Sequence, residues 1–116
     1  KGGVAILNLD GTLKNATWVT GLNAPKGMGI YKRNLYVADI TDVVVIDLTS
    51  GKITNRIEIP GAVFLNDLTV DDKGVIYVSD SRANKIYQVK NNKPDVYVEN
   101  MISANGLKHI GEYLYA

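Results

Sequence analysis

The sequence repeats a pattern of four short segments about every forty residues, and this repeat restricts the fold more than any other feature. Three tight-turn segments recur between alternating apolar flanks: "NLDGTL" at 8–13, "DLTSGKI" at 47–53 and "VKNNKPDV" at 89–96. Asp-Gly, Ser-Gly and Asn-Asn pairs of this kind are typical of β-hairpins. The segments before the turns, at 4–9, 43–48 and 85–90, are rich in β-branched or aromatic residues, as strands are.

A second type of hairpin alternates with the first. The segments 27–40, 67–80 and 106–116 each contain an apolar strand, a polar turn and a strand that carries Tyr36, Tyr77 or Tyr115. No long window shows the apolar periodicity of a helix. Four strands in about forty residues are typical of a β-propeller blade, whereas a β-sandwich explains the strands but not their repetition. The sequence therefore predicts an all-β propeller built from four-stranded antiparallel blades.

The repeat also predicts where the blades begin and end. We expect the last two strands of one blade at 1–25, full blades at 26–64 and 65–103, and the first two strands of another at 104–116. This is roughly three blades, whereas closed propellers have about four to eight. We therefore expect the ring to be closed either by the rest of a longer propeller or by a second chain.

The composition limits the partners. The 116 residues include 13 Lys and Arg against 12 Asp and Glu, so a net charge of +1 gives no general attraction to nucleic acid or to an anionic membrane. No apolar run is long enough to span a membrane. The absence of cysteine excludes disulfides and thiolate metal sites and leaves the compartment open.

Several recurring residues have simple structural interpretations. Asp39 and Asp80 follow the second strand of each full unit, so we expect them to cap turns. The three recurring tyrosines are expected to pack in the core or between blades, and Trp18 is interpreted as a packing residue. The only histidine, His109, is interpreted as a structural residue in a strand rather than as a catalytic base.

Lys26, Asn66 and Asn105 occupy equivalent positions in successive repeats, and we call such a set a column. Unlike the recurring aspartates and tyrosines, this column does not keep the same residue type in every repeat. Its members lie 40 and 39 residues apart, just ahead of the first strand of successive units. In a propeller, such positions from neighbouring blades converge on the central channel. Amide oxygens are suitable ligands for Ca²⁺, which takes about six to eight oxygen atoms. Asparagine is also common in turns and left-handed backbone, so a role in the turn is the alternative.

"FLNDLTVDDKGVIYVSDS", followed by "SANGLKHIGEYLYA", resembles the senescence-marker-protein/gluconolactonase family, which is regucalcin-like. The resemblance is strongest over 62–116, and residues 1–61 are equally similar to NHL-type propeller repeats. It implies six blades and an axial Ca²⁺, or another divalent ion such as Zn²⁺, Mg²⁺ or Mn²⁺. In the family a Glu, one or two Asn and an Asp from different blades hold this ion. Asn105 corresponds to a metal ligand of the family, and Asn66 to a residue that binds the metal or lies beside the substrate.

The resemblance gives the leading hypothesis for function. The chain would be part of a metal-dependent hydrolase of the lactonase or arylesterase type, in which the metal polarises the carbonyl of a small-molecule substrate. Asn66 and Asn105 would hold the metal, Lys26 and Asn66 would face the channel, and the Glu and Asp ligands would come from other blades. No catalytic residue is assigned within this chain. The alternative is a non-enzymatic NHL-like propeller that binds a small ligand or a protein partner at its channel face.

Overall fold

The computed structural model describes all 116 residues as twelve β-strands without a helix. The strands are β1 (Gly2–Leu7), β2 (Leu13–Leu22), β3 (Pro25–Tyr31), β4 (Asn34–Asp39), β5 (Asp42–Asp47), β6 (Ile53–Glu58), β7 (Leu65–Val70), β8 (Ile76–Asp80), β9 (Lys85–Lys90), β10 (Lys93–Val98), β11 (Lys108–Ile110) and β12 (Tyr113–Tyr115). The prediction of an all-β chain is confirmed. No helix that could cross a membrane is present.

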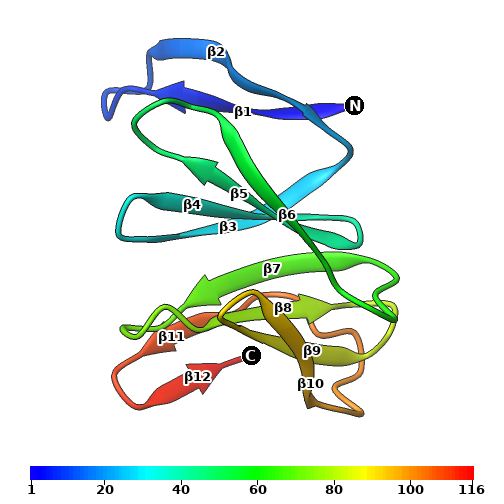
Figure 1. Cartoon of the computed structure of the whole chain (residues 1–116). Coiled ribbons are helices and arrows are strands. Elements are labelled where there is room, and N and C mark those ends of the chain that lie inside the picture. The colour runs from blue at the N-terminus through cyan, green and yellow to red at the C-terminus, as the bar shows by residue number, and fades with distance from the viewer.

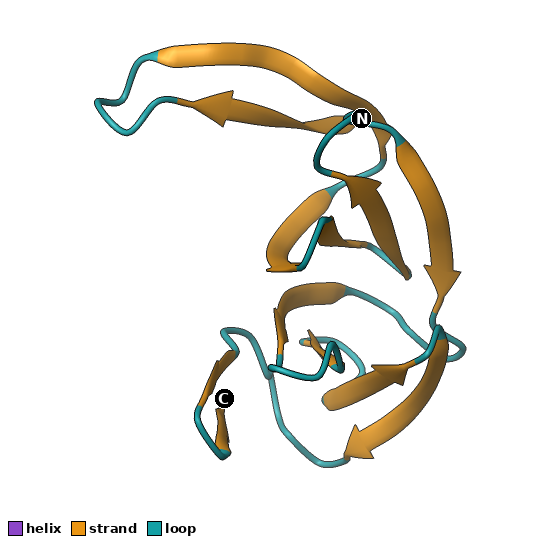
Figure 2. Ribbon diagram, turned by 60° about the vertical axis from the view of Figure 1, so that its left-hand side comes forward, coloured by secondary structure: helices purple, strands orange, loops and turns teal.

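The strands pair into four separate antiparallel sheets, which follow one another in chain order (Figure 1). The first sheet contains β1 and β2, the second sheet β3 to β6, the third sheet β7 to β10, and the fourth sheet β11 and β12. In both four-stranded sheets each strand pairs with the next one along the chain. The two-stranded sheets lie at the two ends of the stack, and no sheet closes on itself (Figure 2).

The turns follow from their residues. Asn91 and Asn92, which join β9 to β10, both have positive φ angles of 50° and 63°. This is the backbone of a primed two-residue turn, whose twist matches that of the flanking strands. Between β5 and β6, the amide of Gly51 donates to the carbonyl of Asp47 (2.8 Å), and Gly51 has a φ of 71°. The predicted hairpins at these two turns are confirmed.

Apolar residues on alternate positions build a core between each pair of neighbouring sheets. The central strands β4 and β5 are buried on both faces, because successive side chains of a strand point to opposite sides. Toward the first sheet these two strands contribute Leu35, Val37, Val44 and Ile46; toward the third sheet they contribute Ala38, Val43 and Val45. A smaller core joins the third sheet to the fourth through Ile86, Ala104 and Leu107.

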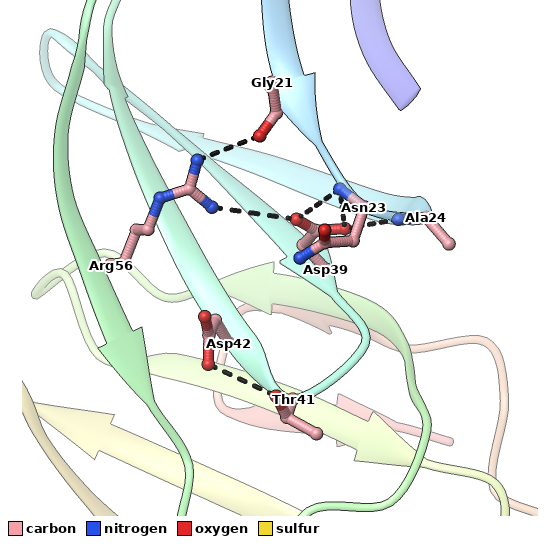
Figure 3. Close-up of polar contacts among 7 residues, drawn as sticks. All are labelled: Gly21, Asn23, Ala24, Asp39, Thr41, Asp42 and Arg56. Atoms are coloured by element: carbon pink, nitrogen blue, oxygen red, sulfur yellow. Dashed lines mark hydrogen bonds and ion pairs between the residues drawn. The ribbon is translucent and has the colours of Figure 1, made fainter. Parts of the chain in front are cut away.

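Asp39 fixes the segment that leads into β3. Its buried carboxylate accepts hydrogen bonds from the amides of Asn23 (2.9 Å) and Ala24 (2.7 Å), as Figure 3 shows. The guanidinium of Arg56 lies 3.9 Å from the same carboxylate and donates to the carbonyl of Gly21 (3.0 Å). Asp39 therefore ties the end of β4 to the start of β3.

Asp80 has the same role in the third sheet. Its fully buried carboxylate accepts from the amides of Val63 (2.7 Å) and Phe64 (3.1 Å), just ahead of β7. It also accepts from the amides of Arg82 (3.1 Å) and Ala83 (2.8 Å) in the turn after β8. The predicted capping role of both aspartates is confirmed.

The packing prediction holds for two of the three recurring tyrosines and for Trp18. Tyr36 is partly buried against the core between the second and third sheets, and Tyr77 against the core between the third and fourth sheets. Trp18 packs against the core between the first and second sheets. For Tyr115 the prediction is wrong: its side chain is 55% exposed, and its ring contacts that of Tyr113. In the structure no other sheet covers this face of β12.

Replacing Asp80 tests the capping role. Asp80→Ala leaves four backbone amides without their acceptor, and we expect the free energy of unfolding to fall by about 3 kcal/mol or more. Urea denaturation measures this change. Asp10→Ala is the matched control, because Asp10 accepts only from Thr12 in an exposed turn. Equal effects of the two substitutions would contradict the role assigned to Asp80.

Tyr87 gives a prediction for alkaline pH. Its hydroxyl is buried without a hydrogen-bond partner, and burial, together with the charge of Asp80, raises the pKa of Tyr87 above its ordinary value of 10.0. As the pH rises, the unfolded chain therefore loses the Tyr87 proton at a lower pH than the folded chain does. The free energy of unfolding consequently falls as the pH rises above 10.0. We expect Tyr87→Phe to reduce this fall and to keep or raise stability at neutral pH, by up to about 1 kcal/mol. Urea denaturation at several pH values, with exposed Tyr113→Phe as control, measures both effects.

Candidate functional site

Equivalent bulges position Lys26 and Asn66 at the start of the first strands of two sheets. On β3, the two residues between Pro25 and Met28 lie opposite a single residue of β4, and β7 has the same irregularity between Leu65 and Leu68. A bulge changes the direction of the side chains within it and is frequent near binding sites. Lys26 and Asn66 lie inside these bulges.

Two cations meet at one aromatic ring beside Asn66. The Lys26 ammonium lies 5.4 Å from the centroid of the Phe64 ring, and the Arg82 guanidinium lies 4.5 Å from it. Lys26 comes from the second sheet and Arg82 from the third, and both side chains are exposed. Neither forms an ion pair, since the chain's one ion pair joins Arg56 to Asp39.

We call Lys26, Phe64, Asn66, Ser81 and Arg82 the entrance cluster. Besides the two ring contacts, its internal link is the amide of Asn66, which donates to the hydroxyl of Ser81 at 3.4 Å. The cluster combines two unpaired positive charges with an amide oxygen that accepts no hydrogen bond within the chain. Such a set favours an anionic ligand that also carries hydroxyl groups.

The turn interpretation of the two asparagines is wrong. Neither Asn66 nor Asn105 has a positive φ, so neither occupies the left-handed backbone conformation. Their side-chain oxygens hold no Asx-turn either; the amide of Leu68 donates instead to the carboxylate of Asp67 (2.9 Å). Asn105 is exposed, and its contact with the third sheet is made by its backbone carbonyl. Both amide oxygens are therefore free to accept from a ligand.

Ser79 and Asp67 connect the segments that carry the two asparagines. The hydroxyl of Ser79 accepts from the amide of Asp67 (3.1 Å) and donates to the carbonyl of Asn105 (2.5 Å). The carboxylate of Asp67 accepts from the amide of Leu107 (2.9 Å), just ahead of β11. The positions of Asn66 and Asn105 relative to each other are thus set by backbone contacts through one hydroxyl and one carboxylate.

Sequence analysis did not identify Asp67 or Ser79, although the repeat contains a signal for both. In the preceding unit the equivalent residues are Gly27 and Ala38, so two polar side chains replace two small apolar ones together. The two residues are also in contact in the structure, because the amide of Asp67 donates a hydrogen bond to the hydroxyl of Ser79. Comparison of these two columns would have identified both residues.

A divalent ion would find only part of a coordination shell here. The free acceptors are the amide oxygens of Asn66 and Asn105, and both oxygens of the Asp67 carboxylate already accept a backbone amide. No group of three or more His, Cys, Asp or Glu in the chain is placed to hold a metal ion. Since Ca²⁺ takes about six to eight oxygens, the residues present do not fit a complete metal site.

His109 lies at the opposite ends of the strands from the entrance cluster. It lines a cleft of about 340 Å³ between the third and fourth sheets, together with Tyr77, Tyr97 and Tyr113. Its ring nitrogen Nε2 lies 2.9 Å from the carbonyl of Gly111 in its own hairpin, and its amide donates to the Thr69 hydroxyl (3.2 Å). These contacts support the structural interpretation of His109.

No protein-family model and no curated protein matches this sequence. The resemblance to the gluconolactonase family therefore stays a hypothesis.

The close approach of β3 to β7 predicts a strong effect at one glycine. A Cβ atom at Gly27 would overlap the carboxylate and the backbone of Asp67, and neither can move without losing the bond to Leu107. We expect Gly27→Ala to lower the free energy of unfolding by about 2 kcal/mol or more. Gly106→Ala is the control, because a Cβ there meets no atom within 4 Å. Thermal and urea denaturation measure both, and a tolerated Gly27→Ala would contradict the packing described.

Proposed function

We propose that the chain is a section of a β-propeller that binds a small hydroxylated carboxylate, such as a sugar acid, at the entrance cluster. The propeller arrangement is supported by two successive four-stranded meanders whose faces pack on each other. It is also supported by the equivalent bulges that begin β3 and β7. In this arrangement β3, β7 and β11 line the channel, and the entrance cluster faces one of its mouths.

The convergence of Lys26 and Arg82 on the Phe64 ring is the observation on which the proposal rests. Two cations without acidic partners lie against the same aromatic ring, which stabilises them without neutralising their charge. A ligand carboxylate would supply the missing negative charge. The free oxygen of Asn66, whose amide donates to Ser81 beside Arg82 in the sequence, would accept from a ligand hydroxyl.

Titration with gluconate tests this proposal. We expect gluconate to bind, and Lys26→Gln and Arg82→Gln each to weaken binding about tenfold or more, since each removes a charge-assisted hydrogen bond. Calorimetry or NMR shift mapping measures the affinity. Lys14→Gln, which removes an exposed lysine of β2, is the control, and neutral glucose is the control ligand. Equal binding of glucose and gluconate, or no effect of either substitution, would contradict the proposal.

Metal-dependent hydrolysis of a lactone or ester is the second candidate. The observation that favours it is that the side-chain oxygens of Asn66 and Asn105 accept no bond within the chain, although Ser79 and Asp67 fix their backbones. In this case the remaining metal ligands would come from outside the chain, and Ca²⁺ or another divalent ion would polarise the carbonyl. Both candidates place the ligand at the end of the strands that carries Asn66. They differ in the charge of the species that binds first, which is a carboxylate anion in the first candidate and a divalent cation in the second.

Calorimetric titration with Ca²⁺ separates the candidates. If the ion is part of the function, the closed ring binds Ca²⁺, and Asn66→Ala and Asn105→Ala each weaken binding without unfolding the protein. Asn15→Ala, in an exposed part of β2, is the matched control. A folded ring without Ca²⁺ affinity would exclude the second candidate and leave the carboxylate-binding function standing.

A further inference from the structure

Asn105 is the only asparagine of the chain that is followed by a glycine. Asn105 and Gly106 are both exposed, and they lie in the irregular segment between β10 and β11. The contact of Asn105 with the third sheet is made by its backbone carbonyl, which leaves its side-chain amide without a partner in the chain. This amide is therefore free to react as well as to bind.

The backbone amide of Gly106 is free too. It donates no hydrogen bond within the chain, and no atom lies within 4 Å of the place where a Cβ atom of this residue would be. The situation at Asn66 is different, because the amide of the following residue, Asp67, donates to the hydroxyl of Ser79 (3.1 Å). The nitrogen that follows Asn105 can thus approach the side-chain carbonyl carbon, whereas the nitrogen that follows Asn66 is held in place.

The hydroxyl of Ser79 makes the Gly106 amide more acidic. It donates to the carbonyl of Asn105 (2.5 Å), which belongs to the same peptide group as the nitrogen of Gly106. The other acceptor near this hydroxyl, the carbonyl of Asp67, lies farther away at 3.3 Å. When the nitrogen loses its proton, negative charge spreads onto the carbonyl oxygen, and a donor already aimed at that oxygen stabilises the charge. Ser79 is fully buried, where such a hydrogen bond is stronger than in water.

We propose that Asn105 is a site of spontaneous deamidation, which the hydroxyl of Ser79 promotes. A base from the solvent removes the amide proton of Gly106, and the nitrogen attacks the side-chain carbonyl carbon of Asn105. The new carbon–nitrogen bond closes a succinimide ring. The bond from that carbon to the side-chain nitrogen breaks, and this nitrogen takes a proton from the solvent and leaves as ammonia. Because the reacting atoms belong to neighbouring residues, the attack is intramolecular and needs no encounter of separate molecules.

Water then opens the ring in one of two ways. Cleavage of the bond to the side-chain carbon gives aspartate, and cleavage of the bond to the backbone carbon gives isoaspartate, in which the main chain runs through the former side chain. Either product carries one additional carboxylate, which lowers the net charge by one from +1. The isoaspartyl product also lacks the backbone carbonyl to which Ser79 donates, and it lengthens the segment that Asp67 holds through the amide of Leu107. The modification therefore changes both the charge of this segment and its attachment to the third sheet.

Peptide mapping by tandem mass spectrometry, after incubation of the folded chain at mildly alkaline pH, tests the inference. We expect aspartate and isoaspartate to accumulate at position 105. In Ser79→Ala, which lacks the hydroxyl, the rate should fall about tenfold or more. Alanine is compatible with the fold at this position, since Ala38 is its equivalent in the preceding unit, and circular dichroism checks that the variant is folded.

Ser50→Asn is the matched control for the role of the free glycine amide. It places a second exposed asparagine ahead of a glycine, but the amide of Gly51 is held by the carbonyl of Asp47 (2.8 Å). We expect position 105 to react faster than position 50 in this variant. The comparison is made within one folded chain, so it is decisive even if Ser79→Ala fails to fold.

Three results would overturn the inference. They are a folded chain that accumulates neither product at position 105, a rate that a folded Ser79→Ala leaves unchanged or raises, and equal rates at positions 50 and 105 in Ser50→Asn. The readout is the mass and the isoaspartate content of the chain, so the inference does not depend on which ligand the entrance cluster binds.

Discussion

The carboxylate of Asp67 is the contact on which the arrangement of the sheets depends most. It lies against Gly27 of the second sheet, is held by the amide of Leu68 in the third, and accepts from the amide of Leu107, ahead of the fourth. The apolar cores press neighbouring sheets together but are not directional. The bond from the amide of Leu107 to this carboxylate is directional, and it fixes the segment ahead of β11 relative to β7. The same bond holds the segment that carries Asn105 against the third sheet, together with the bond from the Ser79 hydroxyl to the carbonyl of Asn105.

The local structure could be predicted from the sequence because it is decided by short-range rules. Turn residues such as Asn91 and Asn92 mark the hairpins, and a continuous apolar run such as 43–46 marks a strand buried on both faces. The capping aspartates Asp39 and Asp80 were also predictable, since they recur with the repeat. The exposure of Tyr115 was not predictable from the repeat, because a repeated residue is buried only where a neighbouring sheet is present to cover it.

The candidate site was predicted only in part. The column of Lys26, Asn66 and Asn105 lies at the end of the strands that carries the entrance cluster, and the turn role considered for the asparagines is wrong. Arg82 and Phe64 were missed because they lie outside that column, and the contact of Phe64 with Lys26 forms only when the second and third sheets pack. A contact between residues from different sheets leaves no periodic trace in one sequence. What the structure adds is a site with two unpaired cations, which changes the chemistry expected of its ligand.

Amide hydrogen exchange, measured by NMR in the natural chain and in Asp67→Ala, tests the central role of Asp67 most directly. The account predicts that the amide of Leu107 is protected in the natural chain through its bond to Asp67. In Asp67→Ala, this amide and those of β11 and β12 should lose protection, whereas the amides between β4 and β5 should keep it. Unchanged protection of Leu107 and of the fourth sheet in Asp67→Ala would contradict the account, because the fourth sheet would then be held by its apolar core alone.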